Sequence, residues 1–168
     1  MTGADLAPGD GVDLTVDFAS GSLEARFQTV CVFNVLEHTF DPLTVLRNAL
    51  ACVAPGGALL VVTPVIWPLH RYPVDSCRLL SDWYETFAAR ARIELLPEHF
   101  CWLSEFGIET IGSAANASDP TFQSRARYTA PARYWTSRII HRLFHTFGRS
   151  HWATHTAIGV AFRIMRNG

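Results

Sequence analysis

The chain has 168 residues, of which 49% are hydrophobic and 17% are charged. This composition excludes a disordered chain, because disorder requires low hydrophobicity and high charge, and the length predicts a single domain over residues 1–168. No apolar run approaches the roughly 20 residues that a membrane-spanning helix needs. The N-terminus has no basic stretch followed by an apolar one, so we expect a cytoplasmic protein without a signal peptide or a transmembrane segment.

The charges are distributed unevenly along the chain. Residues 1–119 contain all 15 acidic residues and six arginines, a balance of −9, whereas residues 120–168 contain eight arginines and no acidic residue. The C-terminal third is therefore strongly basic.

Neither the cysteines nor the histidines show a metal-binding pattern. The four cysteines are more than 20 residues apart and include no C-x-x-C pair, which favours free thiols in a reducing compartment. His141 and His145, like His151 and His155, are four residues apart, but no H-E-x-x-H glutamate accompanies them. We therefore expect no metal site.

The first half of the chain reads as short strands and one helix. Residues 12–16 predict a short strand, and the β-branched and aromatic run 29–33 predicts a buried one. Asp41 followed by proline predicts the start of a helix, since aspartate is a good N-cap and proline suits the first turn. Pro-Gly-Gly at 55–57 should end that helix, and the apolar run 58–63 predicts a strand covered on both faces.

The second half begins with a loop over 65–80 that is rich in proline and aromatic residues. We expect helices over 81–92, with Ser81 as its cap, and over 97–106. The run 133–147 has apolar residues four positions apart opposite arginines and histidines, which predicts an amphipathic helix. Strands are predicted over 108–113 and 157–165.

This alternation of strands and helices predicts an α/β fold with a mostly parallel sheet. The last two strands should pair as an antiparallel edge, with the arginine-rich helix inserted between them. Asn34, Glu37 and His38 directly follow the strand over 29–33. Since ligands of open α/β sheets bind outside the carboxyl ends of the strands, these polar residues are candidates for a ligand site.

Several segments carry a resemblance to a known family. The most specific are TVCVFNVLEHTFDP (29–42), CVAPGGALLVVTP (52–64) and HRYPVDSCR (70–78); weaker ones are TGADLAPGDGVDLTV (2–16), VDFAS (16–20) and EFGIETIG (105–112). These segments resemble class I S-adenosylmethionine-dependent methyltransferases of the type 11 kind. The resemblance covers residues 2–112, and 113–168 forms a C-terminal part with the arginine-rich helix and the final strand. It implies a Rossmann-like methyltransferase sheet, mostly parallel with an antiparallel last strand. The family's G-x-G-x-G loop is missing, so we interpret the chain as an N-terminally truncated, partial methyltransferase domain.

The resemblance implies a site for S-adenosylmethionine at the strand ends. Asp5 would accept hydrogen bonds from the ribose hydroxyls, Asp17 from the adenine amine, and Phe18 would lie against the adenine ring. Asn34 would line the methionine end. The alternative for Asp5 and Asp17 is an ordinary role in turns.

The acceptor side of the implied site lies further along the same rim. His38 is the candidate general base, because its pKa normally lies near neutrality, and Glu37 on the same rim is the second candidate catalytic residue. Alternatively, both only orient the loop. The residues that could contact the acceptor are His70, Tyr72, Asp75 and Arg78, although an Asp75–Arg78 ion pair could instead simply fix the loop.

The expected function is methyl transfer to a small-molecule acceptor, with weak or no cofactor binding by this chain alone. No nucleic-acid partner is expected; a complementing N-terminal fragment or a second copy could complete the fold. The alternative is a non-catalytic, methyltransferase-derived module that binds a partner through its basic C-terminal third. A hydrolase is disfavoured because no G-x-S-x-G motif is present.

Overall fold

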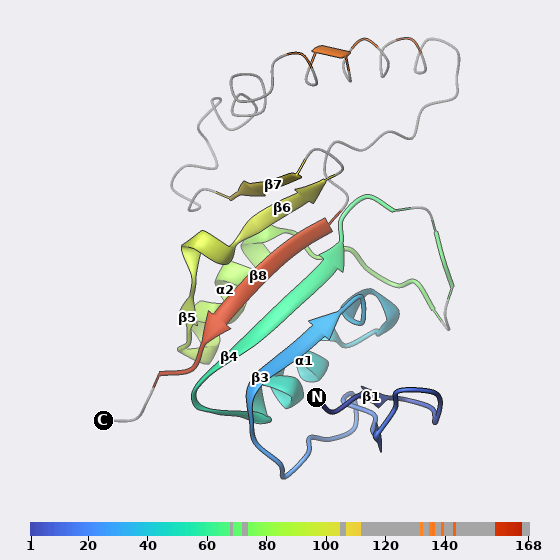
Figure 1. Ribbon diagram of the computed structural model, residues 1–168, viewed down its shortest axis with the longest axis vertical. Helices are drawn as coiled ribbons and strands as arrows, with labels where there is room; N and C mark the ends of the chain where they lie inside the picture. The colour runs from blue at the N-terminus through green and yellow to red at the C-terminus, as the bar shows by residue number, and fades with distance from the viewer. Residues whose placement is uncertain are drawn as a thin grey trace.

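The computed structural model shows an α/β fold built on one six-stranded sheet (Figure 1). It describes residues 1–67, 69–71, 74–104, 107–111, 132, 135, 136, 139, 143 and 157–165. The strand order is β3-β4-β8-β6-β7, and β5 also pairs with β8. A separate parallel pair is formed by β1 (Ala4–Asp5) and β2 (Leu14–Thr15).

Most strands of the main sheet run in one direction, as the sequence predicted. The parallel pair is β3 (Phe27–Phe33) and β4 (Val53–Pro64). Because β8 (Ala157–Arg163) is antiparallel to β4, to β5 (Glu94–Leu95) and to β6 (Cys101–Ser104), these last two run in the same direction as β4. Among the described strands of this sheet, β8 and β7 (Gly107–Thr110) run in the reverse direction. The mixed α/β sheet with an antiparallel last strand is thereby confirmed.

The C-terminal pairing differs from the prediction in two ways. The last strand, β8, lies inside the sheet between β4 and β6 and does not form an edge with 108–113. The predicted helix over 97–106 is a single 3-10 turn, η2 (Pro97–His99), followed by β6. Cys101 and Leu103 pair with β8, and the ladder between strands distant in sequence outweighs the local helical pattern.

The helix α1 (Pro42–Ala51) begins as predicted, since the Asp41 carboxylate accepts a hydrogen bond from the backbone N–H of Thr44 at 3.0 Å. It ends before the Pro-Gly-Gly segment, however. That segment lies within β4, where the register shifts: Phe27 pairs with Val53, but Thr29 pairs with Ala58. Pro-Gly-Gly therefore forms an irregularity in a strand and is not the helix stop that we expected.

The second helix, α2 (Ser81–Ala91), confirms the predicted helix, but Leu80 occupies the N-cap position without a side-chain cap. The predicted Ser81 cap is wrong. Figure 1 shows α1 and α2 behind the sheet. They cover one sheet face, where Leu46 and Tyr84 pack in a core with Leu59 and Phe162.

The opposite sheet face is not covered to the same extent, contrary to the expectation that the apolar strand 58–63 would be covered on both faces. Along β4, Leu59 and Val61 are buried, whereas Leu60 and Val62 are only half-buried. On the neighbouring β3, Cys31 pairs with Leu60 of β4 and is exposed.

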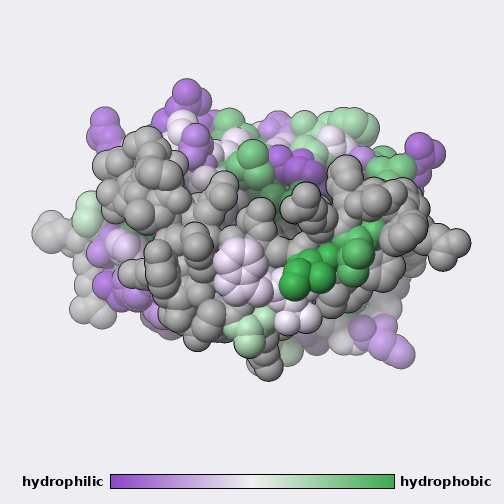
Figure 2. Space-filling view, turned by 90° about the horizontal axis from the view of Figure 1, so that it is seen from above, coloured by the Kyte–Doolittle hydropathy of each residue, from purple (hydrophilic) through white to green (hydrophobic). Residues whose placement is uncertain are grey.

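In the predicted amphipathic helix over 133–147, four described residues are helical: Trp135, Thr136, Ile139 and Leu143. Trp135, Ile139 and Leu143 lie on the surface, each about half exposed. Figure 2 looks down on this end of the molecule and shows strongly hydrophobic atoms at its surface. The other residues of that prediction, Phe147 and the arginines and histidines among them, lie outside the described residues. Within the part of the chain that the structure describes, no helix has the length and apolar character needed to cross a membrane.

Candidate functional site

The polar residues of the candidate site come from the segments that follow β3 and β4. These parallel strands end at the same edge of the sheet, so the segments after them meet there. After β3, Asn34 adopts a left-handed conformation with φ of 52° and donates its backbone N–H to the carbonyl of Val62 at 2.8 Å. The 3-10 turn η1 (Leu36–His38) follows, anchored by the fully buried Leu36.

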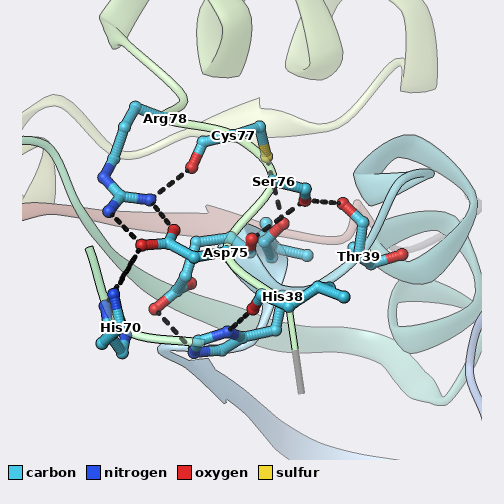
Figure 3. A network of polar contacts seen from close by, with 10 residues as sticks. His38, Thr39, His70, Asp75, Ser76, Cys77 and Arg78 are labelled. Carbon is cyan, nitrogen blue, oxygen red and sulfur yellow. Dashed lines mark hydrogen bonds and ion pairs between the residues drawn. The ribbon is translucent and has the colours of Figure 1, made fainter. Parts of the chain in front are cut away.

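The loop after β4 is fixed to η1 mainly through Ser76 (Figure 3). The backbone N–H and the hydroxyl of Ser76 donate to the carbonyl of Glu37 at 2.8 and 3.0 Å. The same hydroxyl contacts the carbonyl of Thr39, and the Cys77 thiol donates to the carbonyl of Leu36 at 3.3 Å. The side chains of η1 and of the loop therefore form one cluster.

His38 is held in a defined orientation within this cluster. Its Nδ1 lies 2.5 Å from the carbonyl oxygen of Val74, and its Nε2 lies 3.7 Å from a carboxylate oxygen of Glu37. Because a carbonyl only accepts, the contact assigns the proton of neutral His38 to Nδ1 and leaves the lone pair on Nε2. The ring of His70 contacts the His38 ring edge-on, with centroids 4.8 Å apart.

The Glu37 side chain is the buried acid of the site. It is only 1% exposed, and neither of its carboxylate oxygens has a hydrogen-bond partner among the described residues. A buried carboxylate without donors costs several kcal/mol, so a buried orphan of this kind calls for a functional explanation.

Asp75 and Arg78 form an ion pair in which both guanidinium nitrogens of Arg78 donate to the Asp75 carboxylate. The carboxylate also accepts the backbone N–H of His70 at 3.0 Å. These contacts, the Arg78 hydrogen bond foremost, hold the pKa of Asp75 well below its usual range. The alternative in which this pair fixes the loop therefore matches the geometry, and contact with an acceptor stays a prediction. Tyr72 lies outside the described residues.

The structure does not join the remaining predicted residues to this cluster. The carboxylates of Asp5 and Asp17 accept from the backbone N–H groups of Ala7 and Ala19, two residues further on, as the turn alternative predicts. Phe18 packs against the core. Cofactor contact by these residues and by Asn34 stays a prediction.

Two groups of the site were not predicted from the sequence: the Val74 carbonyl that orients His38 and the Ser76 hydroxyl that fixes the loop. A backbone carbonyl contact cannot be predicted from the residue type. Ser76 could have been predicted as a site residue, because it lies between the candidates Asp75 and Arg78.

A family model described as a methyltransferase domain matches residues 3–119, more than half of the chain. No curated protein matches the sequence.

Solved structures show a similar fold at low sequence identity. The [4+2]-cyclase SpnF aligns with a TM-score of 0.51 and 18% identity over 94% of this chain and 58% of that one. A protein of Galdieria sulphuraria, assigned provisionally as a sarcosine dimethylglycine methyltransferase, gives 0.52 and 14% over 96% and 68%. The complex of the Haloferax volcanii methyltransferase activator Trm112 with its provisionally assigned methyltransferase gives 0.50 and 12% over 95% and 65%. The chain thus spans about three fifths to two thirds of these proteins. The family match shows that the chain belongs to the methyltransferase-domain family, and the solved structures show that it shares their fold.

Proposed function

We propose that the chain takes part in methyl transfer from S-adenosylmethionine to a small-molecule acceptor, at the carboxyl ends of β3 and β4. The observation that carries the proposal is the clustering of Glu37, His38 and His70 at this edge in a chain of the methyltransferase-domain family. Methyl transfer is an in-line displacement, so the protein contributes mainly by positioning the two reactants and excluding water.

In this proposal His38 is the general base for a hydroxyl or amine acceptor. With the Nδ1 proton held by the Val74 carbonyl, Nε2 can accept the acceptor's proton. The carboxylate of Glu37, 3.7 Å away, stabilises the imidazolium that forms. Glu37 is thus a positioning and electrostatic partner, since its burial keeps it from the substrate.

The acceptor would lie on the side of the cluster formed by the loop after β4, where His70, Asp75 and Arg78 would contact it; Tyr72 is the fourth candidate by sequence. The cofactor would lie against Asp5, Asp17, Phe18 and Asn34.

Cofactor binding is the first test of the proposal. Equilibrium dialysis of the chain against radiolabelled S-adenosylmethionine should show weak, saturable binding that S-adenosylhomocysteine competes. Weak binding is expected because no G-x-G-x-G loop supplies backbone N–H groups to the methionine end. Asp17→Ala should lower the affinity further, whereas the exposed Asp10→Ala should not. Binding that S-adenosylhomocysteine does not compete would overturn the cofactor assignment, and tight binding would contradict the argument from the missing loop.

Two kinds of partner could strengthen binding: a complementing N-terminal fragment and a second copy of the chain. A protein activator, as in the Haloferax volcanii complex, is a third. The cytoplasm is the predicted compartment.

The second candidate function is a non-catalytic module that binds a partner through the basic C-terminal third. It is favoured by the exposed apolar side chains of Trp135, Ile139 and Leu143. Transfer of radiolabelled methyl to any hydroxyl or amine compound, abolished by His38→Ala, would exclude this alternative.

A further inference from the structure

Glu37, His38 and His70 form a cluster of three potential metal ligands. One carboxylate oxygen and one ring nitrogen of each histidine lie within 4.8 Å of one another. We propose that this cluster binds a zinc ion, with two imidazole nitrogens and one carboxylate as protein ligands and a solvent-facing fourth position. A set of two histidines and one glutamate is a donor set that Zn²⁺ accepts, and modest side-chain adjustments bring such donors to the 2.0–2.2 Å that zinc requires.

Both histidines are oriented by contacts of the kind that support metal ligands. Such histidines use their second ring nitrogen to bond a backbone carbonyl or a carboxylate. Nδ1 of His38 lies against the Val74 carbonyl, and Nδ1 of His70 lies 3.4 Å from the Asp75 carboxylate. Asp75 is in turn held by both guanidinium nitrogens of Arg78. Figure 3 shows these supporting contacts around the two rings.

The buried carboxylate of Glu37 is an independent observation that points to a cation. Both of its oxygens are buried without a hydrogen-bond partner among the described residues, on a side chain that is 1% exposed. A divalent ion would compensate the buried negative charge. His38 and His70 are more exposed, 17% and 35% at the side chain, and leave the site open to solvent on their side.

Cys77 lies near the cluster but is not part of the ligand set. Its thiol donates a hydrogen bond to the Leu36 carbonyl, and its sulfur is not among the ligand atoms that lie within 4.8 Å of one another. The donor set is therefore nitrogen and oxygen only.

This site could not be expected from the sequence, because Glu37 and His38 are far from His70 along the chain and contacts of Ser76 and Cys77 bring the loop onto η1. The zinc proposal does not depend on the proposed methyl transfer. A bound ion would, however, occupy the nitrogen with which His38 accepts a proton, so the ion-bound state and the general-base state exclude each other.

The test is a calorimetric titration of the whole, chelator-treated chain with Zn²⁺. A second titration uses Co²⁺ and follows the visible absorption of the bound Co²⁺. We expect one ion per chain, a rise in the melting temperature with Zn²⁺, and nitrogen–oxygen coordination in the Co²⁺ spectrum. His70→Ala should weaken binding by at least about tenfold, and Asp75→Ala by about 10–100-fold through the orientation of His70. His99→Ala, which removes an exposed histidine outside the cluster, should bind as the wild type does.

Glu37→Gln keeps the shape of the side chain, removes its charge, and should also abolish the thermal shift with Zn²⁺. Because Glu37 is buried and this variant could misfold, the zinc affinity of the His70→Ala variant, which changes a partly exposed residue, decides the test. Absence of stoichiometric binding by the wild type would overturn the proposal. So would unchanged binding in His70→Ala, or an equal loss in His99→Ala.

Discussion

At the scale of single residues, the hydroxyls of Thr63 and Tyr84 form a buried pair at 2.6 Å. Burial raises the pKa of Tyr84 well above its usual range, so the phenol stays protonated and the bond persists into alkaline solution. Tyr84→Phe leaves the Thr63 hydroxyl unpaired in the core and should cost about 1–3 kcal/mol of unfolding free energy. Chemical denaturation measures this cost.

Thr63→Val is the matched partner variant, and the double variant should cost clearly less than the sum of the two single ones, because no orphan hydroxyl remains. Strictly additive costs would show that the two hydroxyls do not act as a pair.

The Asp75–Arg78 pair predicts an acid-dependent loss of stability. The pKa of Asp75 is lowered in the folded chain, chiefly by the Arg78 hydrogen bond, whereas the unfolded chain has the ordinary value of about 3.9. The unfolded state therefore binds the proton more readily, so the contribution is fully present above about pH 4 and is lost as the pH falls below it.

Denaturation curves between about pH 6 and 2.5 should show this decline in the wild type and a shallower one in Asp75→Asn. Exposed Asp10→Asn is the control and should keep the wild-type slope. An equal slope in Asp75→Asn would contradict the assigned pairing.

At the scale of elements, Gly57 allows the backbone of β4 to lie close to the start of β3. A side chain at Gly57 would place its Cβ 2.6 Å from the carbonyl oxygen of Gln28 and 2.9 Å from that of Ala54, both rigid backbone atoms. Gly57→Ala should therefore destabilise the fold by about 1–3 kcal/mol. The control is Gly21→Ala, where nothing lies within 4 Å and the backbone is ordinary.

Thermal unfolding followed by circular dichroism compares the two variants. Gly57→Ala should lower the melting temperature by several degrees and Gly21→Ala should leave it within about a degree. Equal melting temperatures would show that the backbone around Gly57 in β4 can shift to accommodate a side chain without a loss of stability.

The elements also show what the sequence could predict. The start of α1 was predictable, because the Asp41 cap and Pro42 act within one turn of chain. The strand β6 was not, because it pairs with the nearby β7 and also with β8, more than fifty residues away, and the local residue pattern shows neither pairing. The candidate site divides in the same way: Glu37 and His38 were found from their place after a strand, whereas the contact of His38 with His70 depends on how the loop folds back.

At the scale of the whole molecule, the sheet has one well-covered face and one less covered face. On the less covered face of β3, Cys31 and Phe33 are exposed, Phe33 by 51%. Among the described residues, β3 pairs only with β4, which leaves its other edge without a strand partner there. An apolar strand with a free edge favours pairing with another chain.

This arrangement predicts that the chain associates with itself through β3, and that a charge on the strand weakens the association. Phe33→Lys should raise the dissociation constant by about tenfold or more, equivalent to about 1.4 kcal/mol, because a lysine on the exposed face of an edge strand opposes pairing. Phe40→Lys is the matched control: Phe40 is 87% exposed but precedes α1 and lies outside the sheet, so its replacement should leave association unchanged. Sedimentation velocity over a range of concentrations distinguishes the two variants. Equal association of wild type, Phe33→Lys and Phe40→Lys would assign the contact to another surface, of which the exposed Trp135, Ile139 and Leu143 would be the first to test.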